Sequence, residues 1–216
     1  MATAKMKSVF SRQSFAAAIA LVSVSAASTD AVAAGNEALV VDIHGGTVVF
    51  DVATNVPAIG INGKSTALEG RARIRQSADG LVIEQLEAAL PVGTLTTGIG
   101  LRNEHMRKAV FTTPDGLLPD VRFVAERVMC SGSGRAKTCQ LSGDLIIRDA
   151  RRSFAIALKV NDEGNAFRAV GDGVVKLSRY GITPPSQLGV TTMDDVKLHV
   201  DFVVKRADDR IAQGPR

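Results

Sequence analysis

Apolar and polar residues alternate with a period of two along most of this chain. Between Leu68 and Arg75, apolar residues alternate with a glutamate and three arginines, and the run from Val196 to Lys205 has the same pattern. Such alternation buries one face of a strand and leaves the other face in water. It therefore predicts antiparallel strands with one wet face.

We count about eight such runs, and they are separated by turn signals. Many short strands of this kind indicate a sandwich or a barrel. The runs lie near residues 38–43, 46–55, 66–76, 81–95, 121–130, 139–148, 153–161 and 166–178, and a ninth, 194–205, would pair with a split first strand.

The segment from Leu101 to Phe123 departs from the pattern of strands and turns that the rest of the domain shows. Leu101, His105, Ala109 and Val110 recur at helical spacing, while polar and charged residues take the other faces. Asp115-Gly116 and Pro119 then break the pattern. We predict one short helix near residues 100–111, followed by a turn and a new strand.

The same segment resembles the YceI family of exported, lipocalin-like lipid-binding proteins. The family run "R-D-x-H-L … F … P … F" corresponds here to Arg102-Asn103-Glu104-His105-Met106, then Phe111, Pro119 and Phe123. The usual Asp is replaced by Asn103 and the usual Leu by Met106.

Other parts of the chain extend the resemblance to most of residues 34–206. Residues 141–148 are similar to the family's "G-x-L-T-I-x-G" strand, and residues 176–182 to its "R-x-x-F-G-I" run, with Tyr180 as the aromatic residue. Residues 196–200 resemble its final strand and residues 48–52 its opening strand. Asn55 stands where the family commonly has His.

The resemblance implies an all-β, lipocalin-like antiparallel barrel of about eight strands that binds a long apolar molecule in its interior. The implied ligands are a polyisoprenoid, an isoprenoid quinone or a fatty-acid derivative, held for transport, storage or stress protection. The alternative is a filled barrel that docks on a membrane or redox partner without a ligand. Transient membrane contact and oligomeric state are left open.

Inward-facing apolar positions are the expected ligand-lining residues, although such stripes usually pack a solid core. They are Phe50, Val52, Leu68, Ala72, Ile74, Phe123, Leu145, Phe154, Ile156, Phe167, Val175, Leu198, Val200 and Phe202. Arg102, Asn103 and His105 are expected at the mouth, where they would meet a polar headgroup.

Several glycines occupy positions on the apolar face of their expected strands. They are Gly70, Gly143, Gly171 and Gly173. Missing side chains there would leave room for a ligand, because an eight-stranded barrel is either just filled or just able to hold one. Alternatively, these glycines allow tight bends. In a hollow barrel, Gly143→Leu would displace the ligand without unfolding the protein.

Residues 1–33 read as a cleaved secretory signal peptide, with a basic start, an apolar run from Phe15 to Ala27 and a small-residue cleavage site at Ala31-Val32-Ala33. A membrane anchor is the alternative. The leader accounts for +2 of the chain's net charge of +4. We therefore expect a periplasmic domain over 34–206 with little net charge, a flexible tail over 207–216 and no nucleic-acid partner.

Cys130 and Cys139 flank a Ser-Gly-Ser-Gly loop between two expected strands. An even cysteine count in an exported protein favours a disulfide, which would staple this hairpin.

We predict no enzyme, no cofactor and no metal site. Residues 58–65 fit a relaxed phosphate-loop pattern, but a strand rather than a helix follows, so a connecting loop is the better interpretation. His44, His105 and His199 share no metal-ligand spacing. No serine lies in a G-x-S-x-G elbow, and the carboxylates are scattered.

Overall fold

Residues 38–77 and 80–206 are described by the computed structural model, and they belong to one compact unit. The proposed signal peptide and C-terminal tail lie outside these residues. The elements are β1 (Ala38–Thr54), β2 (Gly60–Ser77), β3 (Gly80–Leu90), η1 (Val92–Thr94), α1 (Gly100–Met106), η2 (Arg107–Phe111), β4 (Val121–Ser131), β5 (Ala136–Ile147), β6 (Ala150–Asp162), β7 (Ala166–Lys176), η3 (Leu177–Tyr180), β8 (Ser186–Gln187) and β9 (Val190–Arg206).

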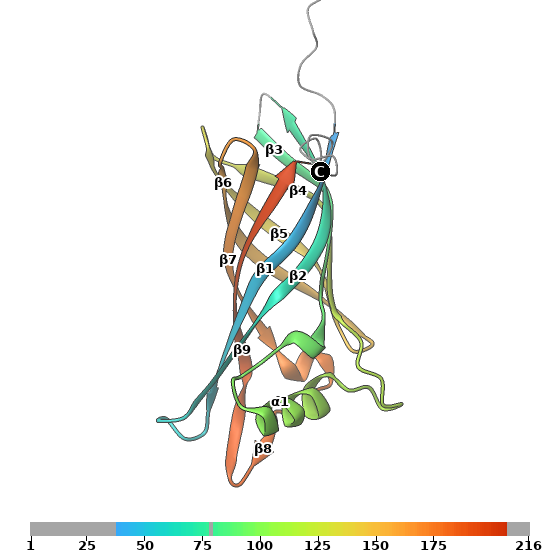
Figure 1. The fold of residues 1–216 in the computed structure, drawn as a ribbon, viewed down its shortest axis with the longest axis vertical. Coiled ribbons are helices and arrows are strands. Elements are labelled where there is room, and N and C mark those ends of the chain that lie inside the picture. Colours follow the sequence, from blue (N-terminus) through green and yellow to red (C-terminus); the bar gives the residue numbers. More distant parts are fainter. Residues whose placement is uncertain (1–37, 78–79, 207–216) are drawn as a thin grey trace, which may run out of the picture. The chain divides into compact units, whose positions relative to one another are not determined.

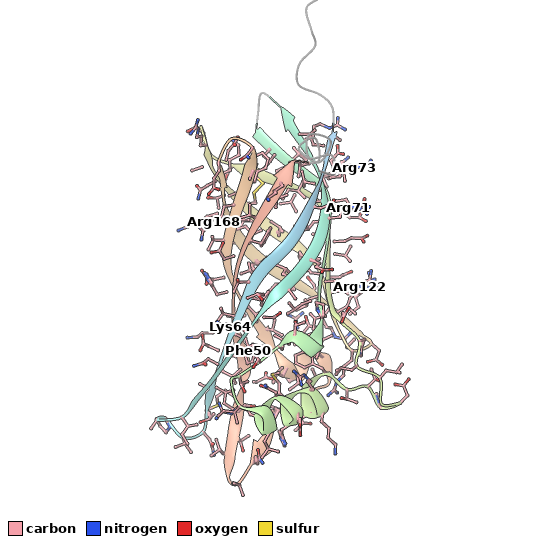
Figure 2. All side chains as sticks on the ribbon, viewed as in Figure 1. Phe50, Lys64, Arg71, Arg73, Arg122 and Arg168 are labelled. Atoms are coloured by element: carbon pink, nitrogen blue, oxygen red, sulfur yellow. A yellow bond between two sulfur atoms is a disulfide. The ribbon has the colours of Figure 1, made fainter. Side chains whose placement is uncertain are left out.

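The long strands form one antiparallel barrel, as the alternation and the resemblance predict (Figure 1). Strands β1 to β7 pair in chain order, β9 pairs with β7, and the β1–β9 pairing closes the sheet. Closure leaves every one of these eight strands with two neighbours, so no long edge is exposed. Outward positions carry charge, and Figure 2 shows Arg71, Arg73 and Arg122 pointing away from the wall.

The predicted helix is present, as α1 with a π-helical continuation, η2, that ends at Phe111. Several expected boundaries differ from the structure. The run expected near 81–95 is a strand only as far as Leu90, and η1 follows it. Strand β1 is continuous, because Gly45 at φ 74° and a register shift at Gly46 bend the strand without ending it. Strand β2 begins at Gly60, so most of the segment interpreted as a connecting loop pairs with β1.

The strand glycines explain how closely neighbouring backbones approach each other. A Cβ on Gly143 would overlap the Val124 carbonyl oxygen and lie 2.9 Å from the Ala125 Cα. Gly70 meets the Glu87 carbonyl and Gly171 the Ala157 carbonyl in the same way. Close approach is thus the explanation that holds at these sites. The expectation that Gly143→Leu would fit into open space is wrong.

Buried apolar side chains pack together in the barrel interior at the end opposite α1. Ile74 pairs with Ile83 there, Leu81 lies opposite Cys130, and Phe167 lies opposite Val204. These side chains are buried in one large apolar cluster.

The predicted disulfide joins Cys130 and Cys139, which face each other across β4 and β5 and are both buried. Removing it with Cys130→Ala/Cys139→Ala should lower the free energy of unfolding by about 2–3 kcal/mol, because the unfolded chain regains the entropy of a short closed loop. Urea denaturation of the oxidised wild type and the double variant measures this difference. Equal stability of the two proteins would contradict it.

Candidate functional site

An apolar cavity of about 250 Å³ occupies the part of the barrel interior next to α1. Its wall comes from every long strand, and α1, η2 and the loop before them cover its end. Engineered apolar cavities of about 150 Å³ stay dry and bind benzene, and small-molecule sites usually span roughly 300–1,000 Å³. The cavity is therefore large enough for part of an apolar molecule.

Most of the predicted lining residues face this cavity. They are Phe50, Val52, Leu68, Phe123, Leu145, Phe154, Ile156, Val175, Leu198, Val200 and Phe202. Phe123 and Phe154 meet edge to face, with ring centroids 6.0 Å apart. Ala72, Ile74 and Phe167 do not line the cavity, although they are buried in the same apolar interior.

Sequence reasoning missed the lining residues that the covering segments contribute. Leu95 precedes the helix, Met106 and Val110 lie on α1 and η2, and Phe111 ends η2. Met106 and Val110 are four positions apart on one helical face, which is a signal that marks residues turned toward an apolar interior.

Hydrogen bonds hold the covering helix in place at several points. The Arg107 guanidinium donates from Nη2 to the carbonyl oxygens of Gly93 (2.9 Å) and Leu95 (3.1 Å). Arg148, from the β5–β6 turn, donates to the Ala109 carbonyl. The helix is therefore fixed to the preceding segment by its own Arg107 and to the barrel by Arg148 of the β5–β6 turn.

The predicted mouth residues divide into two roles. Arg102 and His105 line the cavity, together with Thr97 and Thr192, and are half-buried. Asn103 does not line it. Its Oδ1 accepts hydrogen bonds from the Thr97 amide (2.7 Å) and hydroxyl (2.8 Å), and its Nδ2 donates to Thr96 Oγ1. Asn103 thus positions the loop before the helix.

The family model described as "YceI-like domain" matches residues 39–204. The chain belongs to the YceI family. No curated protein matches the chain in sequence.

Solved structures similar to this YceI-like domain include BcnA of Burkholderia cenocepacia, with 16% identity, a TM-score of 0.55, and coverage of 73% of this chain and 95% of that one. A polyisoprenoid binding domain from Saccharophagus degradans has 13% identity and a TM-score of 0.57, with 79% and 99% covered. The YCEI protein of Campylobacter jejuni has 13% identity and a TM-score of 0.54, with 68% and 85% covered. At these identities the likeness shows the shared fold.

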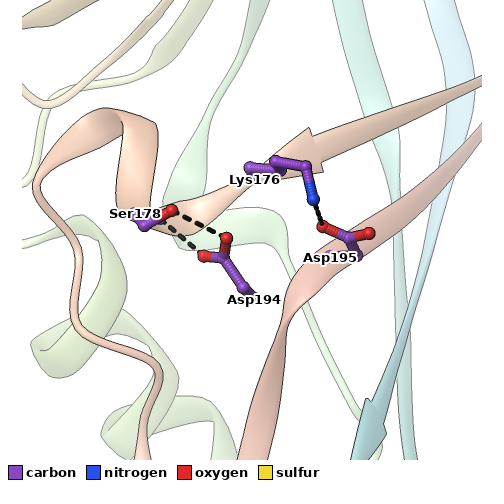
Figure 3. Close-up of polar contacts among 4 residues, drawn as sticks. All are labelled: Lys176, Ser178, Asp194 and Asp195. Atoms are coloured by element: carbon purple, nitrogen blue, oxygen red, sulfur yellow. Dashed lines mark hydrogen bonds and ion pairs between the residues drawn. The ribbon is translucent and has the colours of Figure 1, made fainter.

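A second polar anchor of the YceI-like domain fastens η3 to β9 beside the cavity (Figure 3). The Asp194 carboxylate accepts one hydrogen bond from the Ser178 hydroxyl and one from its amide, both 2.7 Å long. Lys176 pairs with Asp195 one residue further along β9. These contacts hold Leu177, a lining residue, against the cavity.

The hydrogen bonds from the Ser178 side chain and amide lower the pKa of Asp194 below its usual value. Because the folded-state pKa is depressed, this carboxylate stabilises the fold above about pH 4, and that contribution is lost as pH falls. Asp194→Asn, which keeps the shape but not the charge, should be less stable than wild type at neutral pH. The gap should close below pH 4 in thermal melts recorded from pH 7 to pH 3. A gap that does not change with pH would contradict the prediction.

In the described part of the YceI-like domain, possible metal ligands are dispersed and the outer-wall histidine has a carboxylate partner. Within 38–77 and 80–206, no three His, Cys, Asp or Glu side chains gather closely enough to hold a metal ion. His199 pairs with Asp172 at 2.8 Å on the outer wall. In the same residues, no helix is long and apolar enough to cross a membrane.

Proposed function

We propose that this protein is an exported lipid carrier that holds a long apolar molecule in the barrel beneath α1. The observation that carries the proposal is the apolar cavity, which has Arg102 and His105 at its covered end. An apolar chain would occupy the cavity, and a polar headgroup would meet these two side chains. Membership of the YceI family and the fold shared with a polyisoprenoid binding domain support the same ligand class.

Burial of hydrocarbon supplies the binding energy. Each methylene moved from water into the cavity contributes about 0.8 kcal/mol. Because the cavity is small for a long prenyl or acyl chain, we expect the ligand either to displace α1 outward or to leave one end in the mouth. The hydrogen bonds of Arg107 and Arg148 are the contacts that such a movement breaks.

Export to the periplasm is part of the proposal. The disulfide supports it, because such bonds persist in oxidising compartments and are rare in the cytosol. We infer a cleaved leader over residues 1–33 from the sequence pattern. N-terminal sequencing of the mature protein, expected to begin at Ala34 or Gly35, tests this part.

Mass spectrometry of organic extracts tests the ligand directly. Protein purified without detergent from its own periplasm should release a polyisoprenoid, a quinone or a fatty-acid derivative in stoichiometric amount. A cytosolic protein of similar size, purified in parallel, controls for lipid carried over non-specifically. Extracts without lipid, together with no binding of added polyprenol or ubiquinone, would instead support a ligand-free interaction module.

A further inference from the structure

Large apolar side chains are exposed on the loops around the mouth of the cavity. Leu188 is 97% exposed, Leu101 69% and Leu117 62%. With Ile59, Ile99, Leu118 and Met193, they form what we call the apolar rim. Figure 1 shows the β1–β2 connection, α1, the loop before β4 and the β8–β9 hairpin at one end of the barrel. Seven large apolar side chains gathered at one end of the barrel make this end a candidate interaction site.

The segments that carry most of the rim are free of charge. Residues 52–63, 88–101 and 180–193 contain no Asp, Glu, Lys or Arg, although such residues make up 22% of the chain. A surface exposed only to water usually carries about 25–35% charged residues. Uncharged segments of this length are compatible with a surface that moves from water into an apolar environment.

Hydrogen bonds hold the rim loops in fixed conformations. Asn55, at the β1–β2 connection, donates from Nδ2 to the Gly189 carbonyl and accepts at Oδ1 from the Thr191 amide, which ties two rim loops together. Thr113 exchanges backbone and hydroxyl hydrogen bonds with Leu117 across a tight turn. The apolar side chains are therefore presented on rigid supports.

Leu188 occupies a position that is unfavourable for leucine in water. Its backbone has φ 51° at the tip of the β8–β9 hairpin, and Gly189 follows at φ 81°. Such turns prefer Asn or Gly, which tolerate the left-handed conformation. At this tip, however, the residue is a leucine that is almost fully exposed. Neither the backbone conformation of the turn nor burial in the core explains why a leucine occurs there.

We propose that the apolar rim docks on the surface of a lipid bilayer, with the mouth of the cavity facing the lipid. The tips project from separate loops, so they suit a fluid surface that adapts to each of them. A stable protein partner needs about 800 Å² of continuous, complementary surface on each side. Because residues 52–63, 88–101 and 180–193 carry no charge, insertion of the tips on these three segments does not require burying an ion in hydrocarbon. Asp115 and Asp120 flank Leu117 and Leu118 on the remaining loop, and both are exposed. This docking does not depend on whether the cavity holds a ligand.

Flotation of the mature protein with phosphatidylcholine–phosphatidylethanolamine vesicles tests the docking. The wild type should float with the vesicles, and high salt or added phosphatidylglycerol should change this little. Leu188→Asn should weaken partitioning about tenfold, since one leucine side chain no longer enters the bilayer. Its melting temperature should stay equal or rise, because Asn fits the turn. Leu101→Gln, on the exposed face of α1, should weaken partitioning similarly.

Met129→Thr is the matched control. Met129 is 73% exposed, but it lies on β4 next to the disulfide, at the barrel end opposite α1. This variant should float like the wild type. The proposal is overturned if the wild type does not float, or if Met129→Thr loses as much binding as Leu188→Asn. It is also overturned if sedimentation shows a dimer that Leu188→Asn dissociates, since the rim would then join two copies.

Discussion

Gly143→Leu should destabilise the barrel by more than about 3 kcal/mol, above the usual range for overpacking. The first atom of any side chain at this position would overlap the Val124 carbonyl oxygen and crowd the Ala125 backbone. The obstacle is backbone that pairs with β5 in the Ala125–Gly143 and Val124–Asp144 register, so it cannot move without opening the ladder. Since domains are stable by only about 5–15 kcal/mol, much of the variant should be unfolded or misfolded.

Circular dichroism and urea denaturation measure this effect, and a pair of alanine variants supplies the control. Gly143→Ala should already be clearly destabilised. Gly60→Ala should be close to neutral, because a Cβ on Gly60 meets no atom within 4 Å. Equal stabilities for the two alanine variants would show that close approach does not explain Gly143.

Features set by local pattern were predictable from the sequence. A period of two identifies strands whatever they pair with, and residues such as His105 and Ala109, four positions apart, identified the covering helix. Two cysteines that flank a short turn-rich loop lie opposite each other once the hairpin forms. The order of the family-like motifs then selected a barrel over a sandwich.

Features that depend on how strands are staggered were not predictable. Alternation shows that Ala72, Ile74 and Phe167 point inward, but their height along the barrel depends on the register of every intervening pair. For the same reason, the sequence could not show that Gly143 on β5 faces the Val124 carbonyl oxygen on β4. Asn103 looked like a mouth residue because it lies on the helix near Arg102, yet its amide is occupied by Thr96 and Thr97.

The cavity itself therefore has to be filled from a position that already faces it, and Ala88 on β3 is suitable. Ala88 lines the cavity and lies between Gly70 and Phe123 in the ladder. Ala88→Leu adds an isopropyl group to the space that a ligand would occupy. Filling an empty cavity commonly adds about 0.5–2 kcal/mol of stability, so the delipidated variant should melt at or above the wild-type temperature.

Whereas Ala88→Leu should keep or raise the melting temperature, it should weaken ligand binding. Ala88→Leu should release at least tenfold less lipid in organic extracts, because each methylene excluded from the cavity costs about 0.8 kcal/mol of binding energy. Ala155→Leu adds the same group on the exposed outer wall of β6 and should keep wild-type lipid content. Lipid content that is unchanged in Ala88→Leu would place the ligand outside this cavity. If lipid content fell in both variants, the cause would be a general disturbance of the protein, because only the side chain at position 88 reaches the interior.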